Sequence, residues 1–232
     1  MQIRAEKRNT AVLRKIKVIF AFTAAAAVLS SCTDSMEESS ARPYNKTEIL
    51  GEWYNDSIGG SFKFSENDQM YLLVDLSETM TIDSEGNVQM TSSGKPFSGE
   101  SEYDGKTFTF SADGENGMIN VLTMERAGES SDSIYGEYTL KSGILSDQLT
   151  ERFGDSDGRY SMIIGETSVI TEIEMCSYTA ENGILNLSGS DLKIFGAEGD
   201  NDIVYDFAVQ NDVLTLSRGG TVMSFAKVAE DQ

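Results

Sequence analysis

The chain has 232 residues, with 18 basic residues against 38 acidic ones, no histidine and two cysteines. Without histidine it cannot carry a Ser-His-Asp triad, a Cys-His pair or a histidine-ligated metal. Its net charge of −20 opposes binding to nucleic acid, because proteins bind nucleic acid largely by neutralising phosphates with basic side chains.

Residues 1–31 have the pattern of a secretory signal peptide. The start of this segment is basic and contains a single acid; its basic residues are Arg4, Lys7, Arg8, Arg14, Lys15 and Lys17. The residues that follow, 18–31, are uncharged and mostly apolar. This apolar stretch is shorter than the roughly 20 residues that a helix needs to span a bilayer. We therefore predict a cleaved export signal and not a transmembrane helix.

Leu29-Ser30-Ser31-Cys32 closes this segment and resembles the signal of bacterial lipoproteins. The resemblance implies cleavage before Cys32, lipidation of Cys32 and a place in the cell envelope of a Gram-negative-type bacterium. We expect an outer-membrane lipoprotein, on either the periplasmic or the surface-exposed face. Six of the 18 basic residues and one of the 38 acidic residues lie in residues 1–31, so the remainder has 12 basic and 37 acidic residues and a net charge of −25. That charge opposes adsorption to anionic lipid, so the lipid on Cys32 would provide the attachment.

Residues 32–46 are polar and rich in Ser and Glu, which predicts a flexible acidic tether. The second cysteine, Cys176, has no disulfide partner if Cys32 carries lipid. It lies where apolar residues alternate with acids, so we expect a small buried apolar side chain there.

From residue 49 onward the chain reads as β-structure. Apolar and polar residues alternate in short segments, as expected for strands with one buried face; the clearest are 61–65, 106–111, 213–217 and 222–228. Turn sequences separate them, among them Asp104-Gly105, Asn182-Gly183 and Asn211-Asp212. Residues 143–153 could hold a short helical turn.

The β-region also repeats itself. Four segments recur in the same order: 49–54 matches 134–139, 83–94 matches 179–190, 103–110 matches 209–216, and 119–126 matches 222–228. We therefore predict two modules in tandem, residues 47–128 and 132–230, joined by a polar segment. One larger β-sandwich or barrel over the same residues is the alternative.

Gly51-Glu52-Trp53, just after the tether, resembles the Gly-x-Trp opening of lipocalins and of short lipocalin-like bacterial lipoproteins. In the second module the matching residues are Gly136-Glu137-Tyr138, with Tyr in place of Trp. The resemblance implies antiparallel up-and-down strands closed into barrels, with Trp53 packed at the base of the first barrel. For Trp53 we favour a structural role in the core over a role in stacking on a ligand.

The chemistry-bearing motifs do not define an active site. Asp155-Ser156-Asp157-Gly158 is the strongest metal candidate, but Arg159 and Tyr160 stand where an EF-hand loop needs an oxygen ligand and a glycine. A hydrolase that uses two carboxylates is the less favoured alternative, because among 37 acids the sequence selects no pair. We predict no enzyme activity, no metal and no cofactor.

The function predicted is that of a non-catalytic, lipid-anchored binding protein. Its ligand would be a small apolar molecule or a glycan, contacted by tyrosines that the core does not need; the candidates are Tyr71, Tyr103, Tyr160, Tyr178 and Tyr205. The alternative is a structural or interaction subunit of an outer-membrane complex, with an envelope protein as its partner.

Overall fold

The computed structural model describes residues 44–56, 59–92, 95–97, 99–114, 117–154, 158–189 and 202–229. Three sets of expectations lie outside the described residues: the signal peptide with Leu29, Ser30, Ser31 and Cys32, nearly all of the tether, and the acidic turn that begins at Asp155. Nothing in the structure therefore tests the export signal or the lipid anchor.

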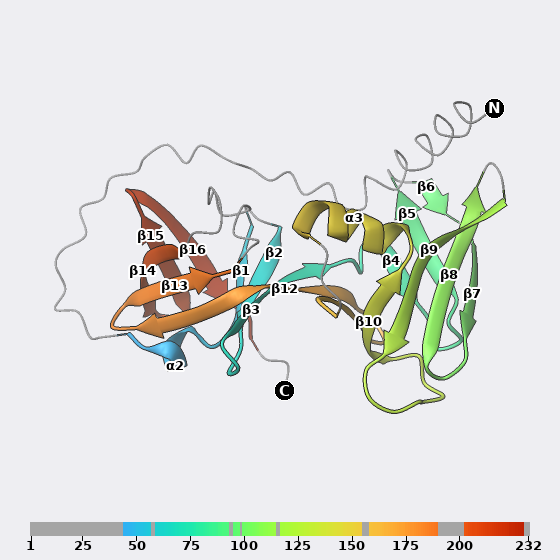
Figure 1. The fold of residues 1–232 in the computed structure, drawn as a ribbon, viewed down its shortest axis with the longest axis horizontal. Helices are drawn as coiled ribbons and strands as arrows, with labels where there is room; N and C mark the ends of the chain where they lie inside the picture. The colour runs from blue at the N-terminus through green and yellow to red at the C-terminus, as the bar shows by residue number, and fades with distance from the viewer. Residues whose placement is uncertain are drawn as a thin grey trace. The chain divides into compact units, whose positions relative to one another are not determined.

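Strands dominate the described residues (Figure 1). The first nine strands are β1 (Gly51–Asn55), β2 (Gly60–Phe64), β3 (Gln69–Asp75), β4 (Met80–Ile82), β5 (Val88–Ser92), β6 (Lys95–Phe97), β7 (Gly99–Tyr103), β8 (Thr107–Gly114) and β9 (Gly117–Arg126). The others are β10 (Gly136–Ser142), β11 (Tyr160–Ile164), β12 (Val169–Glu181), β13 (Ile184–Ser188), β14 (Ile203–Gln210), β15 (Val213–Arg218) and β16 (Thr221–Lys227). The helices are α2 (Lys46–Ile49) and α3 (Ile144–Phe153). Neither helix has the length and hydropathy needed to cross a membrane.

The predicted fold class is confirmed. The chain is nearly all β, and its main sheet is antiparallel, up-and-down and partly closed into a ring. The residue patterns account for this: β14 buries alternate residues along its first half, and Asn182 and Gly183 both have the positive φ that a tight hairpin turn requires.

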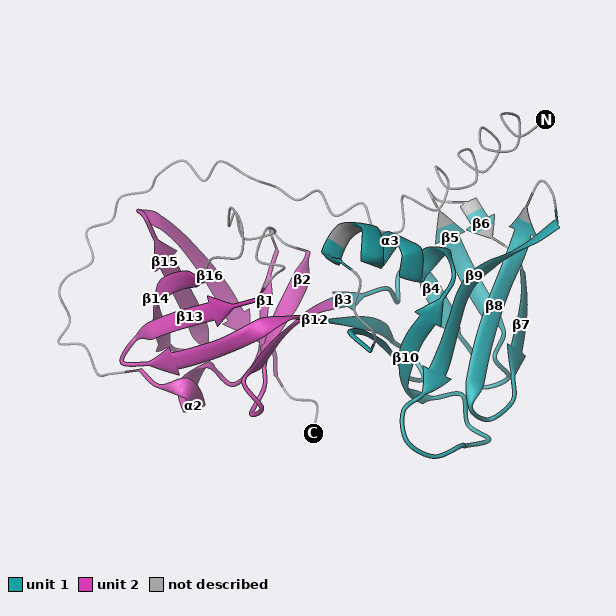
Figure 2. Cartoon of the chain, in the orientation of Figure 1, with its two compact units in different colours: residues 1–21, 74–173 teal, residues 22–73, 174–232 magenta. Residues whose placement is uncertain are grey.

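The chain divides into two compact units (Figure 2). Unit 1 is formed by Val74–Ile173, and unit 2 by the described residues before Val74 and after Ile173. This division differs from the expected modules 47–128 and 132–230, whose boundary falls inside unit 1. The difference arises because the first three described strands pair with the last ones, so that the two ends of the described part build one unit.

Unit 2 is a ring of strands that closes on itself. Its neighbours run in the order β13, β14, β15, β16, β1, β2, β3 and β12, and β12 pairs again with β13. The first and last strands of the chain, β1 and β16, meet in this ring, with Trp53 opposite Lys227. Several aromatic side chains are buried in it, among them Trp53, Phe62, Phe64, Tyr178, Phe207 and Phe225. Pairs of these rings touch, because the ring centroids of Phe62 and Phe225 lie 5.7 Å apart and those of Phe64 and Tyr178 lie 5.1 Å apart.

Unit 1 contains an up-and-down run of strands from β7 to β11, continued by the first residues of β12. Strands β4, β5 and β6 form a second sheet, and α3 packs against β9 and β10. The alternating segment 106–111 behaves as predicted, since both Phe108 and Phe110 are fully buried. Buried Met124, Tyr138 and Met162 extend the same core.

Candidate functional site

The Gly-x-Trp motif lies on β1, where Trp53 is completely buried. Its indole Nε1 donates a hydrogen bond of 2.6 Å to the backbone oxygen of Ile49, which satisfies the one polar atom of the ring. From β16, Lys227 places its Nζ 5.5 Å from the centre of the Trp53 ring. Gly51 has a φ of +110°, a conformation that favours glycine. The motif therefore joins the first strand to the last one.

The matching motif on β10 has the same construction. Tyr138 is completely buried, and its hydroxyl donates a hydrogen bond of 2.6 Å to the backbone oxygen of Ile134. From β9, Arg126 lies opposite Tyr138 with its Cζ 5.6 Å from the centre of the ring. Gly136 has a φ of +152°. A Cβ atom at Gly136 would lie 2.7 Å from Nη2 of Arg126, so the arginine occupies the space that the glycine leaves.

The guanidinium of Arg126 is held by several acceptors. Its Nη1 donates to the backbone oxygen of Ser133 at 2.9 Å and to the Tyr138 hydroxyl at 3.1 Å, and its Nη2 donates to the backbone oxygen of Tyr135 at 2.9 Å. A longer bond of 3.4 Å reaches the hydroxyl of Tyr103. Burial raises the pKa of Tyr138, and the adjacent Tyr103 hydroxyl raises it further, against the opposing effect of Arg126. Tyr138 therefore stays neutral at physiological pH.

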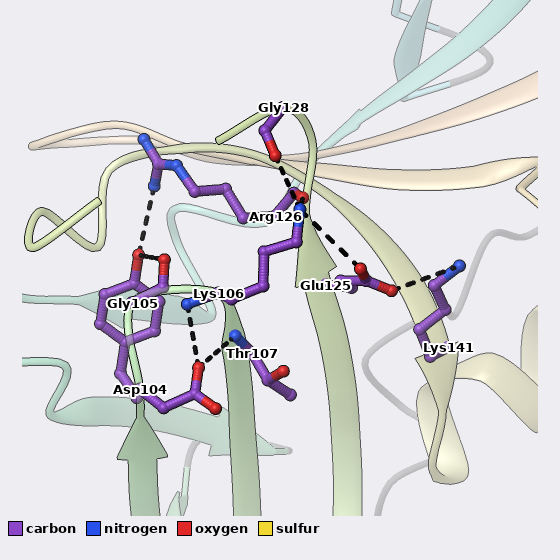
Figure 3. Close-up of polar contacts among 9 residues, drawn as sticks. Asp104, Gly105, Lys106, Thr107, Glu125, Arg126, Gly128 and Lys141 are labelled. Carbon is purple, nitrogen blue, oxygen red and sulfur yellow. Dashed lines mark hydrogen bonds and ion pairs between the residues drawn. The ribbon is translucent and has the colours of Figure 1, made fainter. Parts of the chain in front are cut away.

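Lys106 extends this polar cluster to the loop after β9 (Figure 3). Its Nζ donates to the backbone oxygens of Arg126 and Gly128, at 2.8 and 2.7 Å. The carboxylate of Glu125 lies 3.8 Å from Lys106 Nζ and 3.9 Å from Lys141 Nζ. These contacts fix the end of β9 and the residues that follow it, and most of their acceptors are backbone oxygens.

Asp104 holds the turn that precedes β8 (Figure 3). Its Oδ1 accepts hydrogen bonds from the backbone N–H groups of Thr107 and Lys106, at 2.6 and 2.9 Å. These bonds lower the pKa of the Asp104 carboxyl, Thr107 more than Lys106. The pKa of the Asp83 carboxyl is lowered as well, chiefly by the hydrogen bond from the side chain of Asn87. A general acid requires the opposite shift, so neither carboxyl is suited to act as the general acid of a carboxylate hydrolase.

The predicted site residues thus fall into two places. Gly51 and Trp53 lie together at the β1–β16 closure, and Gly136 and Tyr138 lie together at the β9–β10 pairing, in both cases with a cation from the opposite strand. Within the described ranges, acidic and cysteine side chains form no group of three or more that could hold a metal ion. Cys176 is buried in β12, as its apolar neighbours predicted.

Three of the five tyrosines expected to contact a ligand are buried, so that expectation was wrong for them. Tyr178 donates its hydroxyl to the backbone oxygen of Ser65 at 2.8 Å, and Tyr160 donates to the backbone oxygens of Leu149 and Gly154. Tyr205 is buried as well. Alternation along one strand does not reveal this, because the hydroxyls of Tyr178 and Tyr160 find their partners in a distant turn and at a helix.

One surface feature was missed by the sequence analysis. Tyr54 on β1, Ala226 on β16 and Val213 on β15 lie opposite one another on adjacent strands of unit 2, and all three are exposed. We call these three residues the outer row. The relative exposure of Tyr54 is 41% and that of Val213 is 39%. The sequence contains one signal of the outer row. Val213 is next to the buried Leu214, so its side chain is on the opposite face of the strand from Leu214 and Leu216.

Comparisons with protein-family models, with curated proteins and with solved structures found no match to this chain. The likeness to lipocalins therefore stays a prediction that depends on the residues of the two motifs.

Proposed function

We propose that this chain is a non-catalytic binding protein of the cell envelope, attached to the outer membrane by a lipid on Cys32. The basic start, the uncharged segment 18–31 and the sequence Leu29-Ser30-Ser31-Cys32 support the anchor. The net charge of −25 after Ser31 supports it as well, because such a chain is repelled by anionic headgroups and needs a lipid to stay at the membrane.

The outer row is the observation that favours an interaction with another protein. Tyr54 and Val213 expose apolar surface at the two ends of the outer row, and the chain as a whole is strongly acidic. Burying this surface against a second apolar surface releases water and stabilises a complex. The partner that fits is an envelope protein with an apolar patch surrounded by Lys and Arg, since its charges would complement those of this chain.

The interior of unit 2 favours a protein partner over a small apolar or glycan ligand. A ring of this many strands is just wide enough to be filled by its own side chains or to hold one small ligand. Trp53, Phe64 and Phe225 each expose 2% or less of their surface, so a ligand would have to displace aromatic rings that already pack against one another.

Photo-cross-linking in intact cells tests the proposal. A photoreactive phenylalanine analogue replaces Val213 in the full-length chain, and adducts are identified by mass spectrometry. We expect an adduct with one envelope protein, weakened about tenfold or more by Tyr54→Ser, which removes the apolar ring at the other end of the outer row. Raising the salt concentration during cross-linking of isolated envelopes should also weaken it, because the charge complementarity is screened.

The control places the same analogue at Met118, which is similarly exposed but lies on β9 in unit 1. Equal adducts at positions 118 and 213, or none at 213, would contradict binding through the outer row. Saturable, micromolar binding of a neutral fluorescent apolar probe that Trp53→Phe alters but Tyr54→Ser does not would instead favour a ligand inside unit 2.

A further inference from the structure

The two motif sites share a side-chain hydrogen bond and a cation placed over the ring. In each, a buried aromatic ring donates a bond of 2.6 Å to the backbone oxygen four residues earlier, Ile49 or Ile134. In each, a cation from the neighbouring strand lies over the ring, at 5.5 Å for Lys227 and 5.6 Å for Arg126. The ring and the cation are different residues at the two sites, so what the sites share is the placement of these groups on the backbone.

The backbone around the two sites repeats in the same register. Val228 donates to Glu52 at 2.9 Å, and Ala127 donates to Glu137 at 2.8 Å. On the other side of the cation strand, Lys227 donates to Asp212 and Arg126 donates to Lys106, both at 2.8 Å. Strand β16 in unit 2 therefore corresponds to β9 in unit 1, and β1 corresponds to β10.

The partners cross between the two sequence repeats. Trp53 belongs to the first repeat, 47–128, but its cation Lys227 belongs to the second, 132–230. Tyr138 belongs to the second repeat, but its cation Arg126 belongs to the first. Each repeat therefore contains one aromatic motif and one cation. The aromatic residue of each repeat lies opposite the cation of the other repeat.

Two strands, β3 and β12, contribute residues to both units. Strand β12 runs without a turn from Val169 to Glu181, although the unit boundary falls after Ile173. Strand β3 leaves unit 2 in the same way, after Leu73. In both repeats the chain passes from one unit to the other within the third strand, β3 or β12. If one repeat formed a barrel alone, its chain would have to turn back within β3 or β12. The exchange of an identical element between two copies is known as domain swapping.

We propose that this protein consists of two copies of one barrel that have exchanged their first three strands within a single chain. Unit 2 combines β1–β3 of the first repeat with the last residues of β12 and β13–β16 of the second. Unit 1 combines β10, β11 and the first residues of β12 of the second repeat with β4–β9 of the first. The exchange goes beyond the proposed function and does not depend on it.

Nuclear magnetic resonance of the mature chain tests the exchange without any substitution. Val228 is bonded to Glu52, so the next pair, Trp53 and Lys227, is a non-hydrogen-bonded pair, whose Cα atoms lie about 4.5 Å apart. We expect a strong nuclear Overhauser effect between the Hα atoms of these two residues. The chain has one tryptophan, which makes the assignment direct. The unexchanged arrangement would instead give this signal between Trp53 and Arg126, and that result would overturn the proposal.

Cysteine pairs give a second readout in a background of Cys32→Ser and Cys176→Ala. Tyr54→Cys with Ala226→Cys should form a disulfide within one chain, since these residues lie opposite each other. The matched control is Tyr54→Cys with Glu125→Cys, because Glu125 lies opposite Thr139 as Ala226 lies opposite Tyr54. A disulfide in the control pair and none in the first would overturn the proposal, and so would disulfides found only between chains.

Discussion

Gly136 is the residue where backbone conformation and packing meet most closely. Its φ of +152° and the 2.7 Å between an added Cβ and Nη2 of Arg126 both oppose a side chain. We expect Gly136→Ala to lower the free energy of unfolding by about 3 kcal/mol, from backbone strain and weakened guanidinium hydrogen bonds. Urea denaturation followed by circular dichroism measures the loss.

Gly117 provides the matched control for this substitution. It also lies at positive φ, +111°, but nothing would lie within 4 Å of an added Cβ. Gly117→Ala should cost only the backbone strain, about 1–2 kcal/mol. Equal losses in the two variants would show that the Arg126 contact adds nothing at Gly136.

Tyr178 couples the stability of unit 2 to alkaline pH. Burial, with the charge of Asp68, raises the pKa of Tyr178 to about 12. Because the folded-state pKa lies above the unfolded value of about 10, the stabilisation is complete below pH 10 and is lost as pH rises toward 12. The neutral hydroxyl donates to Ser65, and the ionised form cannot.

The expected result is a fall in the urea midpoint between pH 10 and pH 12 that is smaller in Tyr178→Phe. Ultraviolet absorbance of the phenolate checks the assignment, because the variant should lose one late-titrating tyrosine. An unchanged alkaline slope in Tyr178→Phe would show that other tyrosines cause the decline.

At the scale of elements, α3 shows how tertiary packing reverses a local rule. The residue before it, Gly143, makes no side-chain cap, and serine is normally preferred at that position. However, Gly143 has a φ of +107°, and an added Cβ would lie 2.6 Å from the backbone oxygen of Val121. We expect Gly143→Ser to destabilise the protein by about 2 kcal/mol or more, because backbone atoms of β9 would have to move.

Gly158 is the control for Gly143, since its φ is +79° and nothing would lie within 4 Å of an added Cβ. Chemical denaturation of Gly143→Ser and Gly158→Ser should show the larger loss in the first. A stabilised Gly143→Ser variant would mean that the helix gains more from a cap than the packing loses.

Strand identity was largely predictable, whereas strand partners were not. Alternation correctly indicated that Phe62, Phe64, Leu214 and Leu216 face the core, because the period of two is a local property of each segment. It could not indicate that Trp53 lies opposite Lys227 instead of Arg126. Both repeats carry an aromatic motif and a cation at matching places, so the local signals for the two pairings are the same.

At the scale of the whole molecule, the proposed attachment to the membrane would depend on one atom, the Sγ of Cys32. We expect Cys32→Ala to move the protein from the membrane fraction to the soluble fraction and to abolish incorporation of labelled palmitate. The net charge of −25 after Ser31 opposes adsorption to anionic headgroups. Cys176→Ala is the control and should leave both properties unchanged, because that side chain is buried in β12. Labelled palmitate that is still incorporated into Cys32→Ala would contradict the lipid anchor.

By itself, the sequence determined the class of the protein: an acidic chain without histidine, built of antiparallel strands with tight turns such as Asn182-Gly183. These are consequences of composition and of short-range periodicity, which act within a few residues. Only the tertiary structure decided which strands meet, that the first and last described strands form one unit, and that tyrosines such as Tyr178 belong to the core. Those outcomes depend on contacts between residues more than a hundred positions apart, whose energies no local pattern encodes.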